Sequence, residues 1–281
     1  MARPERPDFI IIGAPKAGTT SLHLHLRAHP EIFMPELKEP RFFGYEGEGE
    51  RLKFPIRTLE EYTALFDAVT DETAIGEATP HYLVYPGAAQ RIHDLIPEAR
   101  LIASLRDPVE RSYSVYQMNL RNRGVNDGVP FVEAMQTDRN LRETYADMLA
   151  RYFALFPAGQ LKVILLEDLE KAPQATMRGL YGFLGVDPGF LPADLLKVAN
   201  PGGEPRNRLL HGLLSDPRLR QFSRAFLPAA AVERLRALRS RNLQKQPLAP
   251  EDRRAAIGFF RDDILRTQDL IGRDLSSWLH A

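Results

Sequence analysis

Glycines, hydroxyl side chains and one lysine lie together between Gly13 and Ser21, in the order Gly-Ala-Pro-Lys-Ala-Gly-Thr-Thr-Ser. The apolar run 8–12 before them predicts a buried strand, and the amphipathic run 22–26 after them predicts a helix, with the hydroxyls offering N-cap chemistry. A glycine loop between a strand and a helix points backbone N–H groups and the positive end of the helix dipole at an anion. The stretch therefore predicts a phosphate or sulfate site, formed by Lys16, Ala17, Gly18, Thr19, Thr20 and Ser21.

The position of the lysine distinguishes this loop from the nucleotide-binding loop of ATPases and GTPases. In that loop the lysine directly follows the second glycine, whereas here Thr19 follows Gly18 and Lys16 lies inside the loop. This register disfavours an NTPase and leaves an ordinary strand-to-helix turn as the other interpretation. The order Pro-Lys-Ala-Gly-Thr-Thr resembles the 5′-phosphosulfate loop of sulfotransferases that use 3′-phosphoadenylyl sulfate (PAPS).

A second candidate anion site follows the strand expected over 100–105. Arg106 lies at the end of that strand, Pro108 opens a helix, and Ser114 lies about two turns into it. A guanidinium and a hydroxyl can then reach one anion from two sides, although a turn with an Arg–Asp pair is the alternative. The run Leu-Arg-Asp-Pro-Val-Glu-Arg-Ser-Tyr-Ser resembles the 3′-phosphate motif of the same family. A donor with a 3′-phosphate needs such a second site, whereas ATP does not.

Candidate residues for the reacting end of the donor lie in two other loops. Glu77 follows a short strand at the edge where open α/β sheets bind ligands, so it is a candidate general base, with a capping or salt-bridging role as the alternative. The resemblance to heparan-type sulfotransferases supports Glu77 as the base and His81 as the fallback. It also makes Lys38, in the run Lys-Glu-Pro-Arg-Phe-Phe, a candidate for binding the sulfuryl group or the acceptor.

Composition limits the remaining possibilities. The 281 residues carry 37 basic and 37 acidic side chains and no cysteine, so neither a nucleic-acid-binding field nor a thiol-based metal or redox site is expected. No apolar run approaches the roughly 20 residues of a membrane span. Many Ala, Arg, Leu and Pro residues and the missing anchor favour a cytoplasmic, bacterial enzyme. The acidic pair after the strand expected over 161–166 could suggest Mg²⁺, but the displaced lysine argues against it, and no metal is predicted.

The remaining pattern predicts helices over 59–66, 86–95, 131–156, 173–184 and 250–279. The arginines around Arg121 are expected at a solvated helix end or in a charge pair at the helix C-terminus, with contact to an anionic acceptor as the alternative. A basic loop containing Arg206 and Arg208 is a candidate for closing over the nucleotide, since sulfotransferases use a late basic loop in this way, although this chain has neither of the family's forms.

The resemblance implies a single domain over 1–281 with a P-loop-like, three-layer α/β fold: a central parallel sheet flanked by helices. It also implies transfer of a sulfuryl group from PAPS to a hydroxyl or amine of a glycan or small-molecule acceptor. Glu77 would take the proton, Lys16 would stabilise the leaving phosphate, and PAP would remain. A P-loop kinase and a PAP-binding module without activity are the alternatives. The acceptor and the oligomeric state cannot be read from the sequence.

Overall fold

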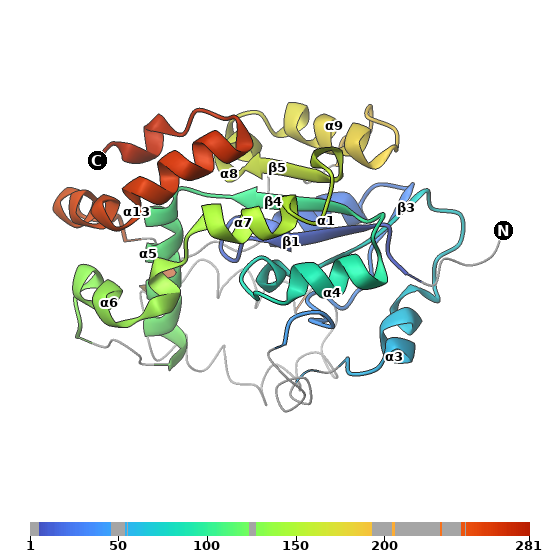
Figure 1. Cartoon of the computed structure of the whole chain (residues 1–281), viewed down its shortest axis with the longest axis horizontal. Helices are drawn as coiled ribbons and strands as arrows, with labels where there is room; N and C mark the ends of the chain where they lie inside the picture. Colours follow the sequence, from blue (N-terminus) through green and yellow to red (C-terminus); the bar gives the residue numbers. More distant parts are fainter. Residues whose placement is uncertain are drawn as a thin grey trace.

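The centre of the molecule is a sheet of five parallel strands in the order β2-β3-β1-β4-β5 (Figure 1). The strands span Phe9–Gly13 (β1), Ile32–Phe33 (β2), Ala74–Ala78 (β3), Arg100–Leu105 (β4) and Leu161–Leu165 (β5). A computed structural model describes residues 6–45, 54, 56–123, 128–192, 204–205, 231, 243–244 and 246–281, and the statements below concern these residues. Within them, β6 (Glu204–Pro205) and β7 (Leu243–Gln244) form a separate antiparallel pair.

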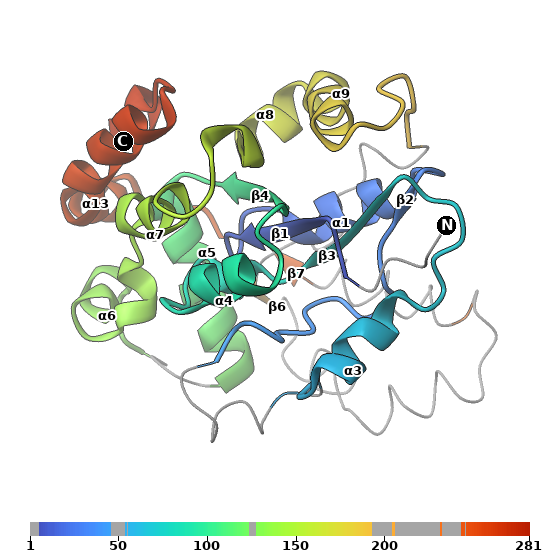
Figure 2. The same cartoon turned by 45° about the vertical axis from the view of Figure 1, so that its right-hand side comes forward.

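Helices cover both faces of the sheet (Figure 2). They span Thr19–Arg27 (α1), Leu59–Thr63 (α3), Ala88–Leu95 (α4), Pro108–Arg123 (α5), Phe131–Thr137 (α6), Tyr145–Phe153 (α7), Leu166–Lys171 (α8), Pro173–Leu184 (α9) and Pro250–Ile271 (α13). The strand side chains alternate between two cores, as the pleat requires. Phe9 and Ile11 pack with α1 and α9, whereas Ile10 and Ile12 pack with α4, α7 and α13. The three-layer parallel fold expected from the sequence is confirmed.

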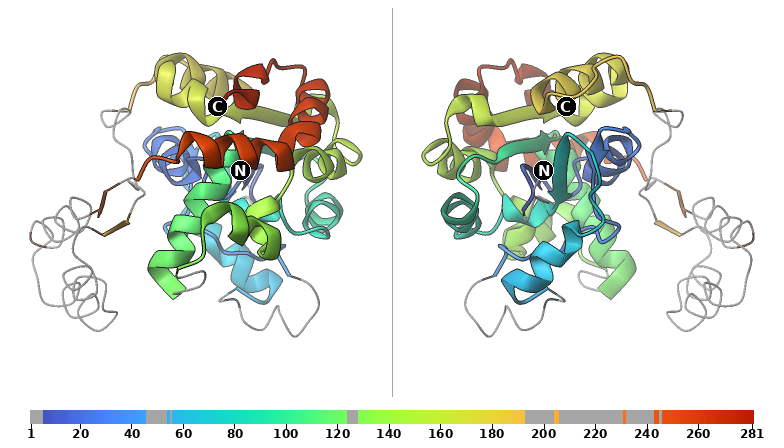
Figure 3. Two further views of the ribbon diagram at one scale, coloured as in Figure 1. Left: turned by 90° about the vertical axis from the view of Figure 1, so that its left-hand side faces the viewer. Right: turned by 90° about the vertical axis from the view of Figure 1, so that its right-hand side faces the viewer.

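Several helix boundaries differ from the predicted ones. The expected helix 131–156 is two helices, because Asp138 leaves helical geometry (φ −93°, ψ 106°) and its side chain accepts a hydrogen bond from the backbone N–H of Asn140. The last helix ends at Ile271 and not at 279, because Gly272 adopts a left-handed conformation (φ 61°). Helix α13 then lies alongside α5 and α7 (Figure 3).

The strand order reverses at the carboxyl end of β1. The chain leaves β1 through α1 toward β2 and β3, whereas β4 pairs with the other side of β1. Open parallel sheets bind ligands where the order reverses in this way. The loops that follow β1, β3 and β4 therefore meet at one edge, and these loops carry most of the candidate site residues.

Candidate active site

The glycine loop ends at the first residue of α1, as the anion-site prediction requires. Gly18 is the N-cap, with φ 78°, and no side chain caps the helix, so the predicted capping by the hydroxyls is wrong. The left-handed backbone favours glycine here, and a Cβ at Gly18 would also lie 2.6 Å from Leu166 Cδ1, so the leucine side chain would have to shift. The first N–H groups of a helix have no intrahelical partner. The N–H groups of Thr19 and Thr20, in the first turn of α1, are therefore available for an anion at this helix start, where Thr20 is half-buried.

The loop after β1 is bound to β4 by three hydrogen bonds. Ala14 N–H donates to the carbonyl oxygen of Ser104 (2.7 Å), and Ser104 Oγ donates to the carbonyl oxygen of Ala17 (2.6 Å). Arg106 Nη1 donates to the carbonyl oxygen of Lys16 over a longer distance, 3.4 Å. The two predicted anion motifs, about 90 residues apart in the chain, are therefore in direct contact.

Lys16 lies among other positive charges. Its backbone is left-handed (φ 68°) and its Nζ lies 3.9 Å from Met118 Sδ, a weak acceptor. Burial lowers the pKa of Lys16, and the nearby charges of Arg121 and Arg106 lower it further. Three cations that repel one another create a field suited to an anion. The sequence interpretation placed Arg121 at a solvated helix end and did not assign it to the anion loop, although it follows Ser114 by seven residues, which is the spacing of one helix face.

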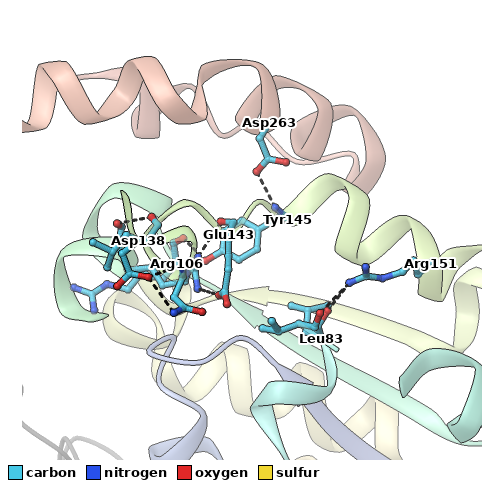
Figure 4. Close-up of polar contacts among 12 residues, drawn as sticks. Leu83, Arg106, Asp138, Glu143, Tyr145, Arg151 and Asp263 are labelled. Carbon is cyan, nitrogen blue, oxygen red and sulfur yellow. Dashed lines mark hydrogen bonds and ion pairs between the residues drawn. The ribbon is translucent and has the colours of Figure 1, made fainter. Parts of the chain in front are cut away.

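Arg106 is held at the start of α5 by polar contacts from several elements. Its Nη2 lies 3.0 Å from Glu110 Oε2, and its carbonyl oxygen accepts from Tyr145 Oη (2.9 Å). The backbone N–H of Tyr145 in turn donates to Asp263 of α13 (2.8 Å), so α7 and α13 support the turn (Figure 4). Ser114 is half-buried and lies one helical turn beyond Glu110. It is therefore on the same side of α5 as Glu110, the residue that pairs with Arg106.

Asp107 fixes the turn between β4 and α5. Its Oδ1 accepts from the backbone N–H groups of Val109 (2.9 Å) and Glu110 (3.2 Å), which is N-cap chemistry. Its Oδ2 pairs with Arg253 of α13 at 2.6 Å. The alternative interpretation of this motif was a turn in which Arg106 and Asp107 form an ion pair with each other. Instead, Arg106 pairs with Glu110, and Asp107 pairs with Arg253.

Glu77 is completely buried inside β3, whereas the sequence placed it just after the strand. Its side chain is 0% exposed and accepts hydrogen bonds from Thr79 Oγ1 (2.9 Å) and Tyr62 Oη (3.3 Å). Burial raises the pKa of Glu77 to about 7, against the hydrogen bonds from Tyr82, Thr79 and Tyr62 that lower it. A general base must come within hydrogen-bond distance of the acceptor, and the Glu77 side chain has no exposed surface. Its role as the base therefore stays a prediction.

A second carboxylate, Glu39, is more exposed than Glu77 and lies beside Lys38 and His81, the two other candidates for the reacting end. Its Oε1 pairs with Lys38 Nζ at 2.7 Å and its Oε2 with Arg41 at 3.1 Å, and its side chain is 29% exposed. Burial would raise the pKa of Glu39, but the hydrogen bonds from Lys38 and Arg41 outweigh it and lower the pKa. His81 Nδ1 lies 3.8 Å from Glu39 Oε2, and burial, helped by the charge of Arg41, lowers the pKa of His81 to about 4. The imidazole is therefore neutral near pH 7.

The structure thus brings most of the predicted residues to one edge of the sheet. Arg206 and Arg208 lie outside the described residues, so the role of the late basic loop stays a prediction. Among the described residues, no cluster of three or more His, Asp or Glu side chains is arranged to hold a metal ion. None of the described helices is both long and apolar enough to cross a membrane.

Comparisons with known proteins agree with this geometry. Residues 6–197 match the model of the sulfotransferase domain. Rat carbohydrate sulfotransferase 15 is 28% identical over 268 residues, covering 71% of this chain and 47% of its own length, so the chain spans about half of that relative.

Two solved structures have the same architecture. The crystal structure of a sulfotransferase from Alicyclobacillus acidocaldarius is 30% identical, with a TM-score of 0.70 over 97% of this chain and 98% of the other. Mouse sulfotransferase SULT7A1, solved with PAP, is 15% identical and shares the fold, with a TM-score of 0.53 over 96% and 87% of the two chains. The domain match covers more than half of the chain, and the chain belongs to the sulfotransferase family.

Proposed function

We propose that this chain, as one domain over 1–281, transfers the sulfuryl group of PAPS to a hydroxyl or amine of a glycan or small-molecule acceptor. One observation supports this most directly: the Lys16 loop and Arg106 follow adjacent strands and share a hydrogen bond of 3.4 Å. Two anion sites side by side suit a donor with phosphate groups at both its 5′ and 3′ positions. The mouse relative of the same fold was solved with PAP, the product that this donor would leave.

The proposed placement of the donor follows from the charges. The 5′-phosphosulfate would lie on the loop residues Lys16, Ala17, Gly18, Thr19, Thr20 and Ser21, with the dipole of α1 behind it. The 3′-phosphate would be bound by Arg106 and Ser114. Arg106 is able to exchange its ion pair with Glu110 for the phosphate, because that pair is partly exposed and such pairs contribute only about 0.2–1 kcal/mol.

The reaction itself is an in-line displacement. The acceptor oxygen or nitrogen attacks sulfur, the bond from sulfur to the bridging oxygen breaks, and PAP departs with the electron pair on that oxygen. Lys16 would stabilise the charge that develops there, as preorganised cations do in phosphoryl transfer. The acceptor's proton passes to a base, and positioning accounts for most of the remaining acceleration.

For the base, the structure favours Glu39 over the sequence-based candidate Glu77. Glu39 is 29% exposed and ionised through Lys38 and Arg41, whereas Glu77 has no exposed surface. Lys38 beside Glu39 would bind the sulfuryl group or the acceptor. His81, neutral and 3.8 Å from Glu39, is the second choice.

Calorimetry with PAP and with ATP, each with and without Mg²⁺, tests the proposal. PAP binding that does not need Mg²⁺, tighter than ATP binding, is the expected result. Tight ATP binding that needs Mg²⁺ would indicate the kinase alternative. Transfer of labelled sulfate from PAPS to an acceptor library separates an enzyme from a module that only holds PAP. A cytoplasmic location and a bacterial source also stay proposals from the composition.

A further inference from the structure

Three hydroxyl groups surround the Glu77 carboxylate, and each belongs to a residue that also contacts the segment 38–43. Thr79 Oγ1 donates to Glu77 Oε2 at 2.9 Å, and Tyr62 Oη donates to Glu77 Oε1 at 3.3 Å. Tyr82 Oη forms a further hydrogen bond with the carboxylate. The carboxylate and both tyrosines are 0% exposed. The cluster therefore acts on its protein neighbours and not on solvent.

Two of these hydroxyls connect Glu77 to backbone N–H groups of that segment. Thr79 Oγ1 accepts from Arg41 N–H, and Tyr82 Oη accepts from Phe43 N–H, each over 3.4 Å. When the carboxylate is ionised, at pH values above its raised pKa of about 7, it is an acceptor only and turns both hydroxyl hydrogens toward itself. The oxygen lone pairs of the hydroxyls are then directed at the two N–H groups. Each connection runs from the loop backbone through a hydroxyl to Glu77.

The third hydroxyl connection passes through an aromatic contact. The ring of Tyr62 stacks on Phe42, with centroids 4.4 Å apart and planes 10° from parallel. Tyr62 is thus fixed at one end by its hydroxyl on Glu77 and at the other by the segment itself. Each of the three residues that hydrogen-bond to the carboxylate therefore also contacts one of the consecutive residues 41–43.

The segment needs such support because its backbone is strained. Glu39 (φ 63°) and Arg41 (φ 58°) are both non-glycine residues in the left-handed region. Each such residue costs on the order of 1 kcal/mol and persists only where the surroundings enforce it. Glu39 N–H also donates to the carbonyl oxygen of Ala78, next to Glu77 in the chain (3.0 Å). The strained residues are those that point charged side chains into the site.

We propose that Glu77 is a positioning residue. Through its three hydroxyl neighbours it holds segment 38–43, in which Glu39 and Arg41 are left-handed, in the conformation that presents Glu39 and Lys38 to the reacting end of the donor. The assignment of Glu39 and Lys38 to that end rests on the proposed function, but the structural coupling between Glu77 and the segment does not. A direct role for Glu77 would require the acceptor to reach a carboxylate that three side chains cover.

Backbone amide exchange without any ligand tests the coupling directly. Thr79→Val and Tyr82→Phe each remove one hydroxyl, and Glu77→Gln replaces one acceptor oxygen by a donor. Because one hydrogen bond contributes about 0.5–1.5 kcal/mol, each change should speed exchange of the amides in 38–45 by roughly 2- to 10-fold. Tyr181→Phe is the matched control. Tyr181 is also fully buried, lies on the other face of the sheet and, among the described residues, has no hydrogen-bond partner for its hydroxyl.

The outcomes separate the two roles of Glu77. Faster exchange in 38–45 for the three variants, and unchanged exchange for the control, supports positioning. Unchanged exchange in all variants overturns it. If Glu77→Gln does not fold, Thr79→Val and Tyr82→Phe decide alone, since each removes only one polar group.

Activity adds a readout that a purely structural role would not move. With PAPS and an acceptor that the wild type sulfonates, Thr79→Val and Tyr82→Phe should lower kcat while the Kd for PAP stays within about twofold. Near-normal kcat in both, with a loss in Glu77→Gln alone, would indicate instead that Glu77 contacts the acceptor. If the wild type transfers no sulfate, the proposed function fails, and the exchange experiment still decides the coupling.

Discussion

Replacing Arg106 by alanine tests whether this chain recognises a 3′-phosphate. The guanidinium is 15% exposed and pairs with Glu110 at 3.0 Å without a ligand, so binding must exchange that pair for the phosphate. Hydrogen bonds to charged groups contribute about 1.5–3 kcal/mol each, and the surrendered pair costs about 0.2–1 kcal/mol. Two such bonds from the guanidinium, less the surrendered pair, give a net loss of roughly 2–6 kcal/mol in Arg106→Ala, which corresponds to a PAP affinity at least about 30-fold weaker.

The ligand 5′-AMP separates this effect from damage to the neighbouring loop. It lacks the 3′-phosphate, and among the described residues Arg106 interacts with the 5′ loop through a long hydrogen bond of 3.4 Å to the Lys16 carbonyl and through its charge near Lys16. We therefore expect the affinity for 5′-AMP to fall by no more than about threefold. Isothermal titration of both ligands measures the difference, with Arg254→Ala, at an exposed position of α13, as the control. Equal losses for PAP and 5′-AMP would refute the assignment.

Three further predictions concern the reacting end. Lys16→Ala should lower sulfate transfer by about 10²- to 10³-fold, as loss of a preorganised charge does, and near-normal turnover of labelled sulfate would reject the anion loop. Glu39→Gln should lower kcat by roughly 10²-fold with an unchanged Kd for PAP, whereas Glu133→Gln, at an exposed position of α6, should change neither; a mild effect would move the proposed role to His81. Burial raises the pKa of Glu77 to about 7, so the folded state favours its protonated form, and this stabilisation is present below pH 4.5 and lost as the pH rises through 7. In urea unfolding, the stability of the wild type relative to Glu77→Gln should fall by roughly 3 kcal/mol from pH 4.5 to 8, and parallel pH profiles would contradict the raised pKa.

The parts of the fold that local pattern controls could be predicted from the sequence. The β-branched run before Gly13 and the strand ending at Leu105 lie where they were expected, because both are parallel strands that are buried along all or nearly all of their length. Helix ends set by local chemistry were also predictable: α9 begins at Pro173 and stops at Gly185 in the left-handed conformation. The region 131–156 was not, since the capping hydrogen bond of Asp138 outweighs an unbroken helical pattern.

The chemistry of the two anion motifs could also be predicted from residue types and their spacing. Lys16 and Arg106 are positive side chains beside a strand end, and that requirement can be read without coordinates. The sequence does not show how exposed each side chain is or which side chains surround it. Glu77, inside β3, and Glu39, in the loop after β2, are both carboxylates, and only packing decides that one is covered by three hydroxyls while the other is 29% exposed between two cations.

The sequence by itself therefore determined the strand–loop–helix units, their order and the anion chemistry of their loops, because these depend on periodicity, glycine and charge within a few residues. The tertiary structure decided which loops meet: the pairing of β1 with β3 and β4 brings together Lys16, Arg106 and the segment 38–43. It also placed Arg121 beside Lys16. Contacts between residues this far apart in the chain arise from sheet pairing and core packing, and no local pattern encodes them.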